Sequence, residues 1–261
     1  MSDPKDDESE PAAERGGADG GMEFFVGYFP MTARQSRFSW TMAAIGLALV
    51  LGAGATIAIG QTGAGAGLSP FHPASVRGLL LDRPYPMLRT RDDDGAIHHV
   101  LLVRGGKFVW DAPPAAVGRV IELSGGLLER DGHRMLEVYS REDGDDAPGV
   151  ELEVATTSLG EVELVGEIVD SKCYLGRMRP GGGRTHRACA QLCIAGGIPP
   201  VLVTHDAHGG TTHYLLASVD GGPVAREVLP YVAEPVRVHG RLERTADLYV
   251  LRIDPATIER R

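Results

Sequence analysis

The pattern of hydrophobic and polar positions divides the chain into one long apolar run and a region of short alternating segments. From Phe38 to Gly60 the sequence has 23 residues without a charged side chain, and at about 1.5 Å per residue such a helix crosses a hydrocarbon core of about 30 Å. We expect residues 38–60 to form a transmembrane helix. A cleaved signal peptide is the alternative, but its charged leader is short and its apolar core is about 7–15 residues long, whereas 37 residues precede this longer run.

Small residues recur every four positions along this span, and such a stripe lets another helix approach closely. They are Ala44, Ala48, Gly52, Thr56 and Gly60. Arg34 and Arg37 precede the span, while residues 60–75 carry no charge, so the positive-inside rule keeps the amino end in the cytoplasm. We therefore expect a single-pass protein of a bacterial inner membrane, whose carboxyl part lies in the periplasm and whose helix docks against a membrane complex.

The amino-terminal segment is acidic and poor in apolar residues. Its first 21 residues contain seven acidic and two basic side chains, which is about half of the net charge of −9. This composition predicts a disordered cytoplasmic tail over residues 1–37, with an aromatic juxtamembrane segment, MEFFVGYFPM, at residues 22–31. Because no basic cluster follows anywhere, we do not expect nucleic-acid binding.

After a linker at residues 61–76, the chain has the short strands and glycine-containing turns that are typical of β-barrels. The segment GGLLERDGHRMLEV at residues 125–138 is echoed by GRLERTADLYVLRI at residues 240–253. We predict two small OB-like β-barrel domains, at residues 77–155 and 162–261, in which these hairpins are equivalent. The same echo indicates that Leu128 and Leu242 face their respective cores. Convergence of two ordinary hairpins, without a true repeat, is the alternative.

All three cysteines and one histidine crowd into a short stretch of the second predicted domain. Between two glycine clusters, THRACAQLC is expected to be a helix, which places His186, Cys189 and Cys193 at positions i, i+3 and i+7 on one face. A loop is then enough to bring Cys173 to them.

Two kinds of site fit these four residues. Three thiolates and one imidazole form a complete tetrahedral set for zinc, and they also suit copper or an iron centre. Alternatively, Cys173 forms a disulfide with Cys189 or Cys193, which leaves one cysteine over, because disulfides persist in exported proteins. A Cys189–Cys193 pair within one helix has Cα atoms about 6 Å apart, near the upper end of disulfide geometry.

Other polar residues are weaker candidates. Further histidines are expected in solvated turns, and Asp170 and Ser171 are expected to bond the local backbone. These histidines are His98, His99, His205, His208 and His213. Common hydrolase, phosphate-loop and zinc-protease motifs are absent, so we do not expect enzymatic activity of its own.

The order Gly-x-Ile-x-Asp-Ser-x-Cys at residues 166–173, followed by His-x-x-Cys-x-x-x-Cys at residues 186–193, resembles a family of small exported bacterial proteins of unassigned function that are themselves predicted to be OB-like barrels. The resemblance covers about residues 162–261. It implies export and a small β-barrel, but no activity.

Together these features predict a membrane-anchored, exported accessory subunit of a membrane or periplasmic redox system. A periplasmic thiol oxidoreductase or metallochaperone, in which Cys189 and Cys193 exchange disulfides or pass copper, is the first alternative. A structural scaffold with an inert disulfide is the second.

Overall fold

The computed structural model describes residues 25–26, 29–30, 32–62, 72–141, 147–148, 152–224 and 226–261. The chain divides into two compact units, Met1–Ala64 and Gly65–Arg261, which are described separately. Most of the expected acidic tail and the segment 63–71 of the expected linker lie outside the described residues.

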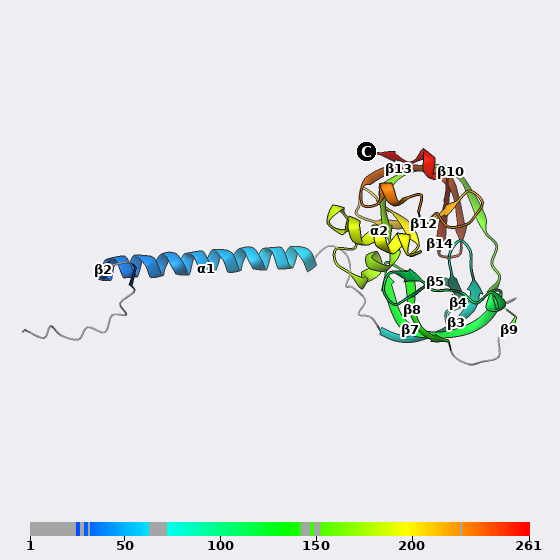
Figure 1. Ribbon diagram of the computed structural model, residues 1–261, viewed down its shortest axis with the longest axis horizontal. Helices are drawn as coiled ribbons and strands as arrows, with labels where there is room; N and C mark the ends of the chain where they lie inside the picture. Colours follow the sequence, from blue (N-terminus) through cyan, green and yellow to red (C-terminus); the bar gives the residue numbers. More distant parts are fainter. Residues whose placement is uncertain are drawn as a thin grey trace, which may run out of the picture. The chain divides into compact units, whose positions relative to one another are not determined.

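The first unit contains a two-stranded hairpin and one long helix (Figure 1). Strand β1 (Phe25–Val26) pairs antiparallel with β2 (Phe29–Pro30), and helix α1 spans Ala33–Thr62. The helix is thus longer at both ends than the predicted 38–60. Its stretch Ala33–Ala58 is long and apolar enough to cross a membrane, and no part of that stretch is buried within the structure.

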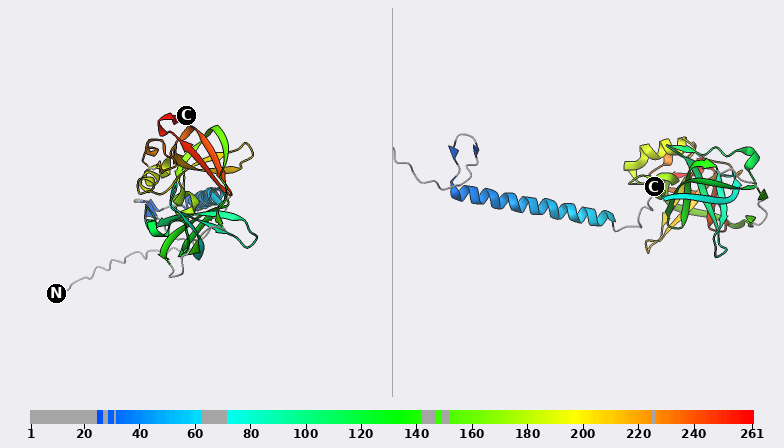
Figure 2. Two further views of the ribbon diagram at one scale, coloured as in Figure 1. Left: turned by 90° about the vertical axis from the view of Figure 1, so that its right-hand side faces the viewer. Right: turned by 90° about the horizontal axis from the view of Figure 1, so that it is seen from below.

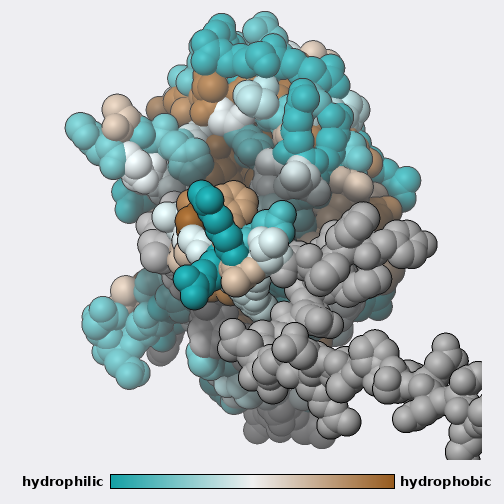
Figure 3. Space-filling view, turned by 90° about the vertical axis from the view of Figure 1, so that its left-hand side faces the viewer, coloured by the Kyte–Doolittle hydropathy of each residue, from teal (hydrophilic) through white to brown (hydrophobic). Residues whose placement is uncertain are grey.

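Apolar side chains cover α1 on every side and are exposed. Large ones include Phe38, Trp40, Leu47, Val50 and Ile57, each at least 60% exposed. On the face of the second unit that is seen in Figure 3, hydrophilic residues lie along the upper and left edges, with hydrophobic residues between them. A helix that is apolar all round requires lipid or protein to cover it.

The second unit is mainly β and contains two closed five-stranded barrels. In the first barrel, the strands are β3 (His72–Leu81), β4 (Met87–Arg91), β5 (Ile97–Arg104), β7 (Arg119–Arg130) and β8 (His133–Arg141). They are hydrogen-bonded in the order β3-β4-β5-β8-β7, and pairing of β3 with β7 closes the barrel. Two short strands extend it, β6 (Phe108–Val109) beside β5 and β9 (Ala147–Pro148) beside β7. Because His72–Val76 pair with β7, this barrel begins inside the segment that was expected to be linker.

The second barrel repeats the same strand order. Its strands are β10 (Thr157–Asp170), β11 (Pro200–His205), β12 (Thr211–Ser218), β13 (Pro235–Thr245) and β14 (Leu248–Ile253). They follow the order β10-β11-β12-β14-β13, β10 closes on β13, and β15 (Glu259–Arg260) adds to β13. In both barrels the third and fifth strands pair in parallel, whereas the other pairs are antiparallel. Short helical turns occur at Pro114–Ala116, Leu229–Tyr231 and Pro255–Thr257.

The two echoed sequences form equivalent hairpins, but the equivalent residues differ by one position from those expected from the sequence. Gly125 pairs with Val138 and Gly240 with Ile253, and at either glycine a Cβ atom would lie within 2.3 Å of a carbonyl oxygen on the partner strand. A bulge at Ser124/Gly125 absorbs the additional glycine. The structural counterpart of Leu242 is therefore Leu127 and not Leu128.

Three clusters of buried side chains account for the packing. One fills each barrel, with residues such as Leu102 in the first and Leu251 in the second. The third joins the barrels and includes Leu128 and Met135 from the first, with Val203 from the second. Leu128 thus lies on the outer face of its barrel, against the other one. Residues 100–103 of β5 are buried on both faces because of this arrangement, which explains why this part of the strand is continuously apolar.

The segment between β10 and β11 carries a π-helical turn, η3 (Cys173–Arg177), a 3-10 turn, η4 (Arg184–His186), and helix α2 (Arg187–Ala195). Figure 1 shows α2 at the side of the second barrel, and the second view in Figure 2 shows the same unit from below. In the first barrel only residues 82–86 join the corresponding strands.

Candidate metal centre

The four residues singled out by their spacing come from three consecutive elements. Cys173 begins η3, three residues after the end of β10. His186 ends η4, and Cys189 and Cys193 lie one turn apart on α2. The loop that connects η3 to η4 packs closely, since a Cβ atom at Gly181 would lie 2.6 Å from the carbonyl oxygen of Cys173. Local helix geometry and this tight loop bring the side chains into two neighbouring groups that share Cys173. One group contains Cys173, His186 and Cys189, and the other contains Asp170, Cys173 and Cys193.

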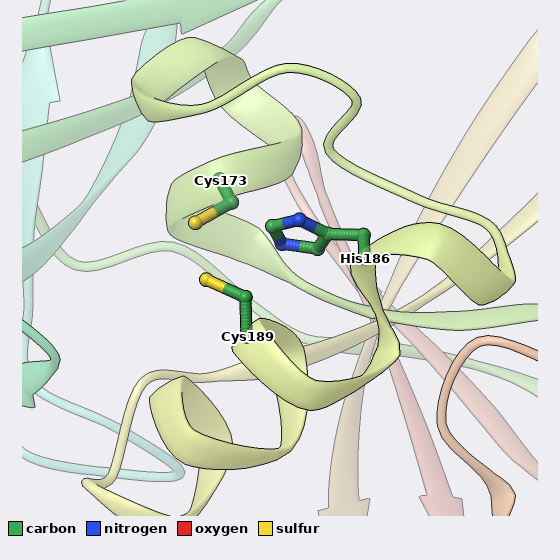
Figure 4. A group of neighbouring side chains, drawn as sticks. All are labelled: Cys173, His186 and Cys189. Atoms are coloured by element: carbon green, nitrogen blue, oxygen red, sulfur yellow. The ribbon is translucent and has the colours of Figure 1, made fainter.

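The side chains converge at distances that suit metal ligands. Ligand atoms of Cys173, His186 and Cys189 all lie within 4.8 Å of one another, and Figure 4 shows the imidazole pointing toward the space between the two sulfur atoms. The Sγ atoms of Cys173 and Cys193 are 4.0 Å apart. Cys173, His186 and Cys193 are at most 4% exposed, while Cys189 is half-buried. All three cysteines of the chain lie in the described part, and none of them forms a disulfide.

Asp170, at the end of β10, contacts both Cys173 and His186. One oxygen, Oδ1, accepts a hydrogen bond from the backbone N–H of Cys173 at 2.8 Å, while Oδ2 lies 3.0 Å from Nε2 of His186. The first contact is the local backbone bond expected from the sequence; the second was not expected. An imidazole that donates Nε2–H to a carboxylate keeps its lone pair on Nδ1, as in the carboxylate–histidine pairs that orient metal ligands.

Two further groups contact the sulfur atoms. Lys107, from the turn between β5 and β6, donates from Nζ to Sγ of Cys189 at 2.8 Å and to Sγ of Cys193 at 3.5 Å. The Sδ atom of Met178 lies 3.7 Å from Sγ of Cys189. Sequence reasoning missed both residues, because neither has a spacing that connects it to the cysteines.

The pKa values of the two buried thiols, Cys173 and Cys193, are shifted in opposite directions. The hydrogen bond between Cys173 and Cys193 raises the pKa of Cys173, and burial raises it further. The same bond lowers the pKa of Cys193, with Lys107 adding to the effect against the opposing influence of burial. The hydrogen bond to Cys189 raises the pKa of Lys107. The cluster therefore favours negative charge on Cys193 beside a positive ammonium group.

The remaining candidate residues lie elsewhere. His98 and His99 contact Asp247, at 3.3 and 2.7 Å, and His205 bonds Thr211. His208 is exposed in a turn, while His213 is buried. None of these histidines belongs to the groups of described residues that come within metal-ligand distance of the cysteines.

The hydroxyl of Ser171 is buried, and no hydrogen-bond partner for it lies among the described residues.

Comparison of the chain with protein-family models, with curated proteins and with solved structures finds no match in any of the three.

Proposed function

We propose that the protein holds a metal ion through Cys173, His186 and Cys189, with Cys193 as the fourth ligand, and serves as a membrane-anchored accessory subunit of a redox system. The observation that carries this proposal is that the ligand atoms of Cys173, His186 and Cys189 lie within 4.8 Å of one another, and that Cys193 joins this group through Cys173, at 4.0 Å between the two Sγ atoms. The cluster is largely closed to solvent.

The distances support a metal better than a disulfide. Zinc–sulfur bonds of about 2.3 Å in a tetrahedral site place sulfur ligands about 3.8 Å from one another. The Cys173 and Cys193 sulfurs lie 4.0 Å apart, close to that spacing, whereas a disulfide requires about 2.05 Å. Thiolate and imidazole ligands suit Zn²⁺, copper or an iron centre.

The anchor in this proposal is α1, and the barrels lie in the periplasm. Arg34 and Arg37 at the start of the helix favour a cytoplasmic amino end. Since the exported side is oxidising, a metal would also protect the thiols from oxidation. In this proposal Cys173, His186 and Cys189 serve as metal ligands, so the protein is assigned a supporting role in the redox system.

The proposal also assigns an OB-like fold to both barrels. Five strands in the order 1-2-3-5-4, closed by the first and fourth and with the third and fifth in parallel, support this assignment for each barrel. The η3–η4–α2 segment is then an insertion between the first two strands of the second barrel, and it carries all four ligands.

Metal analysis of the full chain tests the proposal. The protein, purified from membranes in detergent without chelators, should contain about one equivalent of metal per chain, as expected for a single four-ligand site. His186→Ala and Cys173→Ser should each lose it, while His208→Ala, which removes an exposed histidine, should retain it. Wild-type protein that takes up no zinc, copper or iron would overturn the proposal.

Thiol exchange is the second candidate, and the short Cys173–Cys193 distance favours it. In that case the two thiols give two electrons and two protons to an oxidised disulfide partner, which is reduced to two thiols. Thiol titration of the denatured protein after chelation distinguishes the two functions. Three reactive thiols together with bound metal support the metal centre, whereas a count that changes between three and one with the redox state, in the absence of metal, supports exchange.

A further inference from the structure

The first barrel contributes a charged side chain to the cysteine cluster of the second. Lys107 is the residue that crosses, and its Nζ atom donates to Sγ of Cys189 at 2.8 Å and to Sγ of Cys193 at 3.5 Å. Its side chain is only partly buried, so it covers the cluster at the boundary between the barrels and the solvent.

A second lysine holds the turn that carries Lys107. Lys172, which directly precedes Cys173, is 2% exposed, and its Nζ atom donates to the carbonyl oxygens of Arg104 and Gly106 at 2.8 Å each. The same ammonium group lies 2.8 Å from Oε2 of Glu137 on β8, a residue that is 4% exposed. The second barrel therefore reaches into the first and fixes the two residues on either side of Gly105, immediately before Lys107.

The backbone of α2 makes the return contact. Val109 donates its N–H to the carbonyl oxygen of Gly196, at the end of α2, at 3.2 Å. A Cβ atom at Gly196 would lie 1.8 Å from the carbonyl oxygen of Lys107, so only glycine permits this approach. The turn that carries Lys107 is therefore held by Lys172 on one side and by Gly196 on the other. An incidental surface contact would not need this support.

The charges of the cluster explain why a cation is useful there. With a bound divalent ion, three thiolates and the Asp170 carboxylate exceed the metal by two negative charges, and burying uncompensated charge is costly. The Lys107 ammonium group balances one of these two negative charges. Its hydrogen bonds to the sulfur atoms are strong because the donor is charged.

We propose that Lys107 is the charge-compensating residue of the metal centre, so that the site takes a divalent thiophilic ion of the Zn²⁺ class as a thiolate complex and is complete only when both barrels are present. The inference rests on the proposed function. It identifies Lys107 as a positioning and charge-balancing group and not as a ligand.

Competition between the full chain in detergent and a chromophoric chelator for Zn²⁺ tests this role. Lys107→Met should weaken Zn²⁺ binding by about 10–100-fold, the usual effect of removing a group that supports metal ligands. Lys107→Arg, which keeps the charge and the N–H donors, should restore most of the affinity. Arg104→Met is the matched control, because it removes one positive charge from the end of β5, beside the same turn, without touching a sulfur, and it should bind as the wild type does.

Cobalt(II) provides a readout that a merely structural role would not change. In the Co²⁺-substituted protein, loss of hydrogen bonds to the thiolates raises the energy of the sulfur lone pairs. The sulfur-to-cobalt charge-transfer band of Lys107→Met should therefore move to longer wavelength, while that of Arg104→Met stays in place.

The outcomes separate the two proposals. Wild-type protein that binds neither Zn²⁺ nor Co²⁺ would reject the metal centre itself. If the wild type binds both ions and Lys107→Met matches it in affinity and in band position, the metal centre stands and the role of Lys107 is overturned. A loss of affinity in Lys107→Met that Lys107→Arg does not restore, with an unmoved cobalt band, would also overturn it.

Discussion

His213 lies between the barrels with both ring nitrogens buried, and no hydrogen-bond partner for either lies among the described residues. Its ring packs edge-on against those of His133 and Tyr174, with centroids 4.2 and 5.2 Å away, and it lines a cavity of about 30 Å³. Burial, together with the nearby His133, lowers the pKa of His213 to about 3. The native state thus keeps this imidazole neutral.

This histidine makes stability depend on pH. Below about pH 6.5 the unfolded chain takes up a proton that the folded chain does not bind until about pH 3, so stability that is present above pH 6.5 declines across this window. The loss should reach about 2 kcal/mol at pH 5. Denaturant unfolding at pH 7.5 and pH 5 measures it. His213→Leu should reduce the decline, whereas an equal decline in His213→Leu and in the control His208→Leu would contradict the assignment.

Gly196 tests the contact between α2 and the turn before β6. The backbone of Gly196 has a φ of −81°, which suits any residue, so Gly196→Ala acts only through the close approach to the Lys107 carbonyl oxygen. We expect a loss of about 1–3 kcal/mol from overpacking, together with weaker metal binding. Gly105→Ala is the control, since its Cβ would meet only Oε1 of Glu137, at 3.9 Å. Equal unfolding midpoints for the two variants would disprove the contact.

For single residues, the sequence predicts contacts between side chains that are close together along the chain. Helical spacing is enough to place His186, Cys189 and Cys193 on one face. The ligand atoms of His186 and Cys189 lie within 4.8 Å of each other and of Cys173, whereas Cys193 forms a second such group with Asp170 and Cys173. Lys107 and Glu137 could not be found in this way, because their contacts depend on how two barrels dock. One signal was available: the chain contains only three lysines among 26 lysine and arginine residues, and two of the three, Lys107 and Lys172, lie at or beside the cluster.

At the scale of elements, α1 combines an apolar surface with a stripe of small residues. Along that stripe Thr56 donates its hydroxyl to the carbonyl oxygen of Gly52 at 2.8 Å, so this polar group is satisfied within the helix and needs no water. A smooth, internally satisfied face allows close packing of a second helix in lipid.

We expect Gly52→Leu to weaken co-purification with a membrane partner severalfold while insertion is unchanged, because leucine is apolar but bulky. Gly46→Leu is the matched control: it makes the same change about 200° around the helix from Ala48 on the stripe. Quantitative co-purification from detergent extracts measures the effect. If both variants retain the partner equally, or if the wild type is always alone, α1 is a passive tether.

The strands show which elements a sequence reveals. Apolar or alternating segments such as those of β5 and β12 are recognisable in the sequence, whereas the apolar pattern of β4 is interrupted by Arg89 and Arg91. The hairpins were also predictable, but the position of Leu128 was not. Both faces of the first barrel's strands near the junction are buried, so hydrophobicity alone could not distinguish the inner face from the outer.

At the scale of the whole molecule, the buried pair of Lys172 and Glu137 joins the barrels. Glu137 has two cationic partners that differ in burial: the side chain of Lys172 is 2% exposed and that of Arg177 is 46% exposed. This difference gives a matched pair of substitutions.

Lys172→Met should destabilise the protein by about 3–5 kcal/mol, because it leaves Glu137 charged, buried and without its lysine. Arg177→Met should cost no more than about 1 kcal/mol, as is usual for a partly exposed ion pair. Adding Glu137→Leu to Lys172→Met should recover part of the loss. Denaturant unfolding followed by near-ultraviolet circular dichroism gives these values, and similar costs for the two single variants would show that the buried pair does not hold the barrels together.

The central claim is that the second barrel presents three sulfurs and one nitrogen to a metal, and X-ray absorption at the edge of the bound metal tests it most directly. For zinc-loaded full-length protein we expect a first shell dominated by sulfur at about 2.3 Å with one nitrogen at about 2.0–2.1 Å, and His186→Ala should lose the nitrogen contribution. A first shell of only oxygen and nitrogen, unchanged in Cys173→Ser, would contradict the account.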